Sequence, residues 1–230
     1  MENDHVKKQP ERRSHFKSRI IQFISIYMTL FVLDSCNSRS EDLNFSDGIV
    51  WSSDSTGHFI DPRDGKQYAV VKIKSQIWFA ENLAYRPKRG DFFAIDDNPD
   101  YVSKYGYLYF WETAKDACPE GWHLPSMEEW DTLIQNLGGK AVAGGHLKST
   151  HGWKVKSENT SNISGMSILP AGNKAVGGSY FHLGDDALLW TSTAKSDLST
   201  WKIRLRSNSD SIGFQACSCL TGLSVRCIRD

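Results

Sequence analysis

The stretch from Lys115 to Trp130, KDACPEGWHLPSMEEW, determines how we expect this chain to fold. Pro119 and Gly121 predict the end of a first helix, because proline lacks an amide donor and glycine tolerates a left-handed turn. Ser126 and Glu129 form a capping box, in which a hydroxyl and a carboxylate satisfy backbone amides at a helix start. The stretch therefore predicts two helices, the first over Trp111–Ala117, joined by a stiff connector.

The second helix is expected to turn one apolar face toward the core. Apolar side chains recur along it at intervals of three and four residues, which places them on one side of a helix. Gly138-Gly139 then ends the run, since glycine readily closes a helix. The expected face consists of Met127, Trp130, Leu133, Ile134 and Leu137.

Composition narrows both the class of protein and its partners. The 230 residues include 27 basic and 27 acidic side chains, so there is no electrostatic reason to expect nucleic acid as a partner. Eight tryptophans among many small polar residues indicate a β-rich, loop-heavy domain. We expect six of them to pack inside the domain rather than line a sugar site: Trp78, Trp111, Trp122, Trp130, Trp153 and Trp190.

The N-terminus has the pattern of a bacterial export signal. Basic residues precede an apolar run from Ile20 to Leu33 that is short for a permanent membrane span. The run ends at Leu33-Asp34-Ser35-Cys36, which resembles a lipobox, although Asp34 departs from the residue usual there. We expect a signal peptide over residues 1–35 and acylation of Cys36. This would anchor the protein in the lipid bilayer, in the outer membrane, facing the periplasm or the cell surface.

The alternative is an uncleaved N-terminal anchor with an incidental cysteine. In either case residues 36–58 are polar and lack sustained periodicity, which predicts a flexible tether. Within it, a short strand that docks on the domain is expected from Phe45, Ile49, Val50 and Trp51. Residues 59–230 then form a single domain. Predicted strands cover Gln67–Ile73, Gln76–Ala80, Gly106–Phe110, Gly165–Pro170, Tyr180–Leu183, Leu188–Ser192, Trp201–Leu205 and Ser224–Ile228.

We expect neither a metal ion nor another cofactor. Residues 96–100, Asp-Asp-Asn-Pro-Asp, lack the spacing of an EF-hand, so a solvated surface loop is favoured over a calcium site. His146 and His151 have neither a zinc-binding helix spacing nor neighbouring ligand residues.

Several blocks of the sequence, taken in order, resemble the Fibrobacter succinogenes major paralogous domain family. The resemblance runs from about Phe59 to Asp230 and is specific because the blocks occur together. The main blocks are Gln76-Ile77-Trp78-Phe79-Ala80-Glu81-Asn82-Leu83, Tyr105-Gly106-Tyr107-Leu108-Tyr109, Ala117-Cys118-Pro119-Glu120-Gly121-Trp122-His123-Leu124-Pro125-Ser126 and Ser224-Val225-Arg226-Cys227-Ile228-Arg229-Asp230.

This family is similar to the C-type-lectin-like and sulfatase-modifying-factor group of folds. The resemblance implies an α+β domain with two helices against a twisted antiparallel sheet and a long loop region from about Gly139 to Asn208. Four cysteines remain after Cys36, and they allow three pairings. The resemblance implies a disulfide between Cys118 and Cys227, with Cys217 and Cys219 left over.

The expected function is that of a non-catalytic binding or adhesion module. The Glu-Pro-Asn and Trp-Asn-Asp motifs of calcium-dependent lectins are missing, and no Ser-His-Asp arrangement or phosphate-binding loop stands out. Loops held by a rigid scaffold usually carry binding, so we expect a glycan or an envelope protein to bind there. The candidate ligand-binding residues are Lys174, Tyr180, His182, Asp185 and Asp186.

Two alternatives from other classes stay open at this point. One is a structural envelope protein without a small ligand. The other is a thiol-dependent enzyme that modifies exported proteins through Cys217 and Cys219, which requires an accessible thiol of low pKa.

Overall fold

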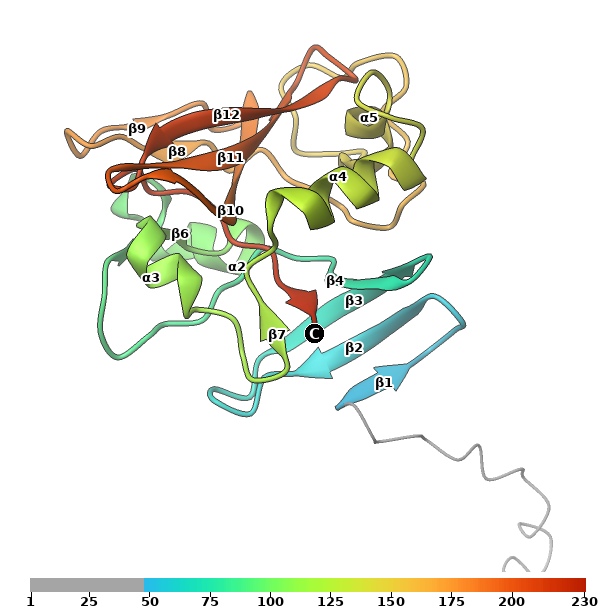
Figure 1. Cartoon of the computed structure of the whole chain (residues 1–230), viewed down its shortest axis with the longest axis horizontal. Helices are drawn as coiled ribbons and strands as arrows, with labels where there is room; N and C mark the ends of the chain where they lie inside the picture. Colours follow the sequence, from blue (N-terminus) through green and yellow to red (C-terminus); the bar gives the residue numbers. More distant parts are fainter. Residues whose placement is uncertain (1–47) are drawn as a thin grey trace, which may run out of the picture. The chain divides into compact units, whose positions relative to one another are not determined.

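Strands from both ends of the domain meet in one sheet. The computed structural model describes residues 48–230, and six of its strands lie in the order β1-β2-β3-β4-β13-β7 with antiparallel neighbours (Figure 1). The last strand therefore lies between β4 and β7. The bounds are β1 Ile49–Trp51, β2 Thr56–Ile60, β3 Gln67–Ile73, β4 Gln76–Phe79, β7 Trp122–His123 and β13 Ile228–Arg229.

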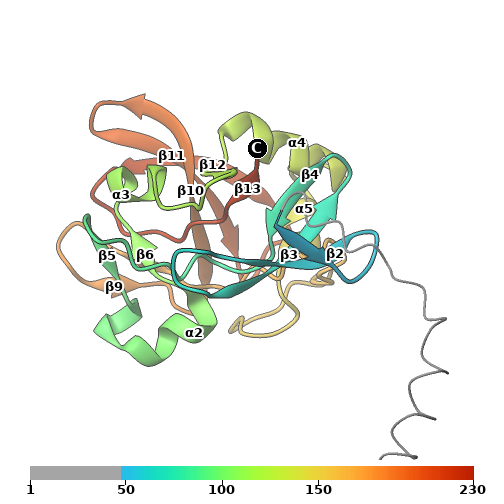
Figure 2. The same ribbon diagram turned by 90° about the horizontal axis from the view of Figure 1, so that it is seen from below.

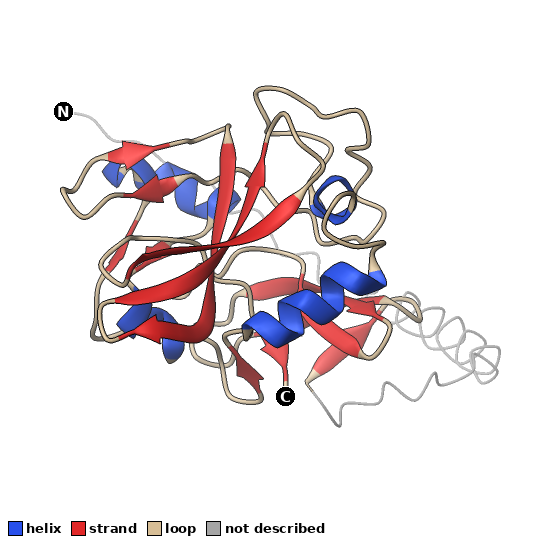
Figure 3. Cartoon of the chain, turned by 45° about the horizontal axis from the view of Figure 1, so that its top comes forward, coloured by secondary structure: helices blue, strands red, loops and turns tan. Residues whose placement is uncertain are grey.

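A second sheet consists of three longer antiparallel strands in the order β10-β11-β12 (Figure 3). They span Asp186–Ser196, Ser199–Arg206 and Ile212–Ser218. Two short pairs accompany them: β5 (Phe92–Phe93) with β6 (Leu108–Tyr109), and β8 (Asn173–Lys174) with β9 (Tyr180–Phe181).

The longest helix, α4 (Met127–Asn136), begins as the sequence predicts. Ser126 Oγ accepts a hydrogen bond from the Glu129 amide at 3.2 Å, and Glu129 Oε2 accepts one from the Ser126 amide at 2.7 Å, so the capping box is confirmed. The other described helices are short: α2 Val102–Tyr105, α3 Trp111–Lys115, α5 Ala143–Leu147 and the 3₁₀ turns η2 Ile95–Asp97 and η3 Pro99–Tyr101.

Three clusters of apolar side chains fill the interior of the described residues, and two of them are large. One gathers Tyr68, Phe79 and Trp190 with the C-terminal residues Val225 and Cys227. The other packs the apolar face of α4 against β10, β11 and β12 through residues that include Trp130, Ile134, Ile203, Leu205 and Ile212. All six tryptophans that were expected in the interior are buried, which confirms that prediction.

The C-terminal segment, residues 224–230, joins the two sheets. The Ser224 amide donates to the Leu188 carbonyl of β10, and the Phe79 amide of β4 donates to the Cys227 carbonyl. The segment ends at Asp230, beside the start of α4 (Figures 1 and 2). Because its hydrogen bonds alternate between the sheets, only Ile228–Arg229 form a regular strand, so the predicted strand over Ser224–Ile228 is wrong for its first four residues.

Arg226 and Cys227 fix this segment in the core. The structure contains the Cys118–Cys227 disulfide that the family resemblance implies, with the two Cα atoms 5.8 Å apart. The buried guanidinium of Arg226 donates to Asn82 Oδ1 at 2.8 Å and to the carbonyls of Met166 and Phe79 at 2.6 and 3.1 Å. Charge without a carboxylate partner is costly to bury, and this burial lowers the pKa of Arg226 to about 9.

The structure confirms an α+β class but corrects several boundaries. Ile49–Trp51 form β1 and Thr56–Ile60 form β2, so the last part of the predicted tether pairs in the sheet. The region from Gly139 to Asn208 contains α5, β8, β9, β10 and β11. The predicted strands Leu188–Ser192 and Trp201–Leu205 lie within β10 and β11, whereas the helix α5 was not predicted. Residues 165–170 make only one bridge, at Ile168, rather than a strand. Four α-helices, not two, occur among the described residues.

The expected signal peptide and Cys36 lie outside the described residues. Within residues 48–230 no helix is both long and apolar enough to cross a membrane.

Candidate functional site

Two of the predicted ligand-binding residues contact each other on the β8–β9 hairpin. Lys174 Nζ donates to the Tyr180 hydroxyl at 2.8 Å and to the Gly178 carbonyl at 3.0 Å, and the Tyr180 hydroxyl donates to Asp97 Oδ1 at 2.5 Å. The Lys174 ammonium also lies over the ring of Phe93. Burial, followed by the hydrogen bond to Asp97, raises the pKa of Tyr180. These side chains therefore hold the hairpin against the turn at Asp97.

The other three predicted residues lie together at the turn between β9 and β10. Asp185 accepts a hydrogen bond from Lys154 Nζ at 2.6 Å. Asp186 is only 4% exposed and accepts two hydrogen bonds from Arg204, from Nη2 at 2.7 Å and from Nε at 3.1 Å. His182 Nδ1 lies 3.8 Å from Asp186 Oδ2. Asp186 thus orients an arginine of β11, which sequence reasoning did not select.

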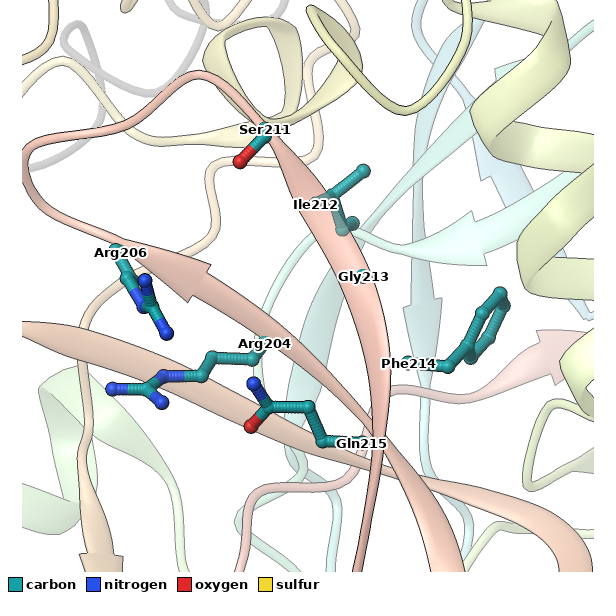
Figure 4. Close-up of a pocket in the computed structure, with 7 residues that line it drawn as sticks. All are labelled: Arg204, Arg206, Ser211, Ile212, Gly213, Phe214 and Gln215. Carbon is teal, nitrogen blue, oxygen red and sulfur yellow. The ribbon is translucent and has the colours of Figure 1, made fainter.

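Arg204 borders a hollow on the outward face of β11 and β12. The hollow has a volume of about 190 Å³ and is lined by Arg204, Arg206, Ser211, Ile212, Gly213, Phe214 and Gln215. The arginine side chains and Gln215 lie on one side of β12, whereas Phe214 points to the other side (Figure 4). The alternation follows from strand geometry, since Ile203 and Leu205 between the polar positions of β11 face the core.

Gly213 leaves the middle of this hollow open. It lies directly opposite Arg204 in the antiparallel ladder. A Cβ atom added there would meet nothing within 4 Å among the described residues. Any other residue at this position would place a side chain between Arg204 and Gln215, so the glycine creates the space.

Charge around the hollow is only partly neutralised. Arg204 is paired with Asp186, and its Nη1 atom makes no hydrogen bond within residues 48–230. The exposed guanidinium of Arg206 has no hydrogen bond or ion pair with any described residue. Guanidinium groups bind carboxylate, sulfate and phosphate through paired hydrogen bonds. The arrangement is therefore suited to an oxyanion.

A larger and less polar groove of about 750 Å³ runs between β3 and the end of α4. Its walls include Val71, Ile73, Leu137 and the exposed Ile163. The ring of His146 is held there by the Leu137 carbonyl at 3.0 Å. Its lining also contains the polar residues Lys72, Lys74 and Asn136, whose side chains form no hydrogen bond or ion pair with one another among residues 48–230.

Burial disfavours the thiolate form of the two remaining cysteines. Cys217 and Cys219 are free thiols at the end of β12. Burial raises the pKa of Cys217 to about 11 and also raises the pKa of Cys219. The thiolate is the reactive form of cysteine, so raised values oppose the low pKa that the thiol-dependent alternative requires.

One histidine lies between two carboxylates but serves the fold. His123 Nδ1 is 2.6 Å from Asp230 Oδ1, and His123 Nε2 is 2.7 Å from Glu129 Oε1. Burial alone would lower the pKa of His123, but the hydrogen bonds to Asp230 and Glu129 outweigh it and raise the pKa. Because Glu129 also caps α4, the trio joins the C-terminus to that helix. Among the described residues no set of three or more His, Cys, Asp or Glu is arranged to hold a metal ion.

The profile of the Fibrobacter succinogenes major domain family matches residues 71–229. The chain belongs to this family. The match covers more than half of the chain and includes the disulfide, Arg226 and the whole of the β10–β12 sheet, so the predicted membership is confirmed. No curated protein and no solved structure matches the chain. The name of the family states no activity, and the function has to be argued from the site.

Sequence reasoning missed the hollow because it missed β12. The signal was partly present: Lys202-Ile203-Arg204-Leu205-Arg206 alternates strictly between charged and apolar residues, the pattern of a strand with one solvated face. The sequence does not reveal which strand pairs with this one, or in what register. Only the register of β11 against β12 brings Gln215 and Gly213 beside the arginines.

Proposed function

We propose that this protein is a membrane-anchored, extracytoplasmic lipoprotein that acts as a non-catalytic binding module for a glycan or an envelope partner. The observation that carries the proposal is the hollow with one unpaired arginine, Arg206, beside a second one that Asp186 holds in place. Polar groups without partners on a rigid sheet cost nothing while they are hydrated, and they are available to a ligand.

The anchor rests on the lipobox-like ending of the apolar run at Cys36. An acylated cysteine followed by a polar segment would hold the domain at the surface of the outer membrane, facing the periplasm or the medium. If Cys36→Ala leaves membrane fractionation and processing of the N-terminus unchanged, this part of the proposal is wrong. The expected result is an unprocessed chain that is no longer labelled by a radioactive fatty acid.

We also propose kinship with the C-type-lectin-like folds. Three features support it: the last strand lies within the sheet formed by the first strands, a disulfide links the residues after α3 to the residue directly before that strand, and α3 and α4 are consecutive helices. Fold kinship by itself does not license a sugar-binding function.

A glycan array tests the binding function. The full chain, solubilised in detergent, is applied to neutral and acidic glycans, and saturable binding to at least one class is expected. A chain that binds no glycan saturably contradicts the glycan-binding form of the proposal and favours a structural role in the envelope.

A further inference from the structure

We propose that the hollow between β11 and β12 binds a single oxyanion group carried by a sugar, such as the carboxylate of a uronic acid or a sulfate ester. The inference rests on the proposed binding function and adds the class of ligand and the residues that recognise it. Arg206 and Arg204 would bind the oxyanion, and Gln215 and Ser211 would meet the hydroxyl groups beside it.

Arg204 is held ready for such a ligand. Asp186 is almost buried and engages Arg204 through Nε and Nη2, which fixes the plane of the guanidinium and leaves Nη1 without a partner in the described residues. A side chain that is already ordered loses little conformational entropy when a ligand binds. Arg206, exposed and without an ion pair in residues 48–230, supplies charge that nothing in the domain neutralises.

The size of the hollow limits what enters it. Pockets for whole small-molecule ligands usually measure roughly 300–1,000 Å³. At about 190 Å³, this hollow accommodates one group and leaves the rest of the ligand outside. The open space above Gly213 lets that group approach the backbone of β12, which no other residue type at this position would allow.

The surrounding charges favour an isolated oxyanion over an extended polyanion. Lys202 follows the same outward face of β11, but Asp185 and Asp186 lie at its other end. A nucleic acid or polyphosphate would place phosphates along the whole face, where the two carboxylates repel them. A sugar with a single oxyanion needs only the guanidinium groups of Arg204 and Arg206, and it presents neutral hydroxyl groups to the rest of the face. The equal numbers of acidic and basic residues in the chain agree with this preference.

The test measures the affinity of the detergent-solubilised full chain for a galacturonate tetrasaccharide and for its methyl ester, by isothermal titration calorimetry. A sulfated oligosaccharide is titrated in parallel, because guanidinium groups donate hydrogen bonds to sulfate as well as to carboxylate. Two variants probe the hollow: Arg206→Gln removes the unpaired charge, and Gly213→Val fills the space, since a Cβ atom there meets nothing within 4 Å among the described residues. Lys202→Gln is the matched control, since it removes the same charge from the same strand face outside the hollow.

We expect binding of at least one charged oligosaccharide and no binding of the methyl ester. The affinity should fall by about tenfold or more in both hollow variants, because Arg206→Gln removes a charge-assisted contact and Gly213→Val blocks the space that the oxyanion enters. Lys202→Gln should bind within about twofold of the wild type. Equal losses in Arg206→Gln and Lys202→Gln would overturn the inference in favour of a diffuse basic surface. Binding that neither hollow variant changes also overturns it, while the proposed binding function survives. If no charged oligosaccharide binds, the inference is wrong, and neutral-glycan binding on the array decides the proposed function separately.

Discussion

The C-terminal segment and the outward face of β11 and β12 both carry arginines, and they use them in opposite ways. Arg226 is enclosed, and its nitrogens donate to Asn82 and to backbone carbonyls. Arg206 is exposed and has no partner among residues 48–230. The family profile covers both arginines, but only Arg226 lies in one of the sequence blocks by which the resemblance is recognised. The comparison teaches that the most recognisable residues of this domain hold the fold, whereas the residues that are free to meet a ligand lie elsewhere.

Removal of the disulfide should have the largest effect on stability. Cys118 and Cys227 are separated by 109 positions, and a cross-link over such a loop stabilises a fold by about 4–5 kcal/mol in the chain-entropy account. We expect the double variant Cys118→Ala/Cys227→Ala to lose most of that free energy of unfolding in urea. Cys217→Ala, which removes a free thiol from β12, is the control and should lose less than about 1 kcal/mol. Similar losses in both variants would show that the disulfide stabilises the fold no more than a free thiol does.

Arg226→Met should have the next largest effect. Methionine fills much of the same volume, but the oxygens of Asn82, Met166 and Phe79 lose their donor inside the core. Each unsatisfied buried acceptor costs on the order of 1–3 kcal/mol. Removal of the buried charge offsets part of this cost, so we expect a net loss of about 3 kcal/mol in the free energy of unfolding. An unchanged or more stable variant would mean that the cost of burying the charge cancels its hydrogen bonds, as in some buried ion pairs.

Lys148→Met should have an intermediate effect on stability, because Lys148 supports the turn between β11 and β12. The ammonium of Lys148, on a side chain only 1% exposed, donates to Ser157 Oγ at 2.5 Å and to the carbonyls of Arg206 and Ser209 at 3.1 and 2.8 Å. We expect a loss of about 2 kcal/mol in the free energy of unfolding and faster amide exchange around Ser209. Lys202→Gln on the outward face is the control. The account is contradicted if amide exchange at Ser209 is the same in wild type and Lys148→Met.

A smaller, pH-dependent effect is expected at His123. Its raised pKa means that the ion pairs with Glu129 and Asp230 contribute fully below the unfolded pKa of about 6.5 and are lost as the pH rises through the folded pKa. The trio is partly exposed, so solvent screening limits its contribution to about 1 kcal/mol at most. The difference in unfolding free energy between wild type and His123→Gln should be larger at pH 5.5 than at pH 8.5. An equal difference at both values contradicts the ion-pair account.

The contrast between the two regions also explains what could be predicted from the sequence. The capping box at Ser126 and Glu129 is local, and four adjacent residues suffice to specify it. The Cys118–Cys227 link became predictable only through resemblance to a family, because three pairings were open on the residues alone.

The site was harder to predict because it depends on pairing between distant residues. Lys174 and Tyr180 were selected as polar loop residues, but nothing in their neighbourhood reveals that Asp97 lies against them. The hollow likewise requires the register of β11 against β12, which determines that Gly213 lies opposite Arg204. Short-range patterns predict elements, whereas the juxtaposition of their outward faces follows from the whole fold.

The central claim is that the side chain of Arg226 stabilises the fold, whereas the side chain of Arg206 contributes little to stability and remains available to a ligand. The most direct test is urea unfolding of Arg226→Met and Arg206→Gln under identical conditions. We predict a loss of about 3 kcal/mol for Arg226→Met and a change within about 0.5 kcal/mol for Arg206→Gln, as is usual for exposed residues. A loss of stability in Arg206→Gln comparable to that in Arg226→Met would contradict the account.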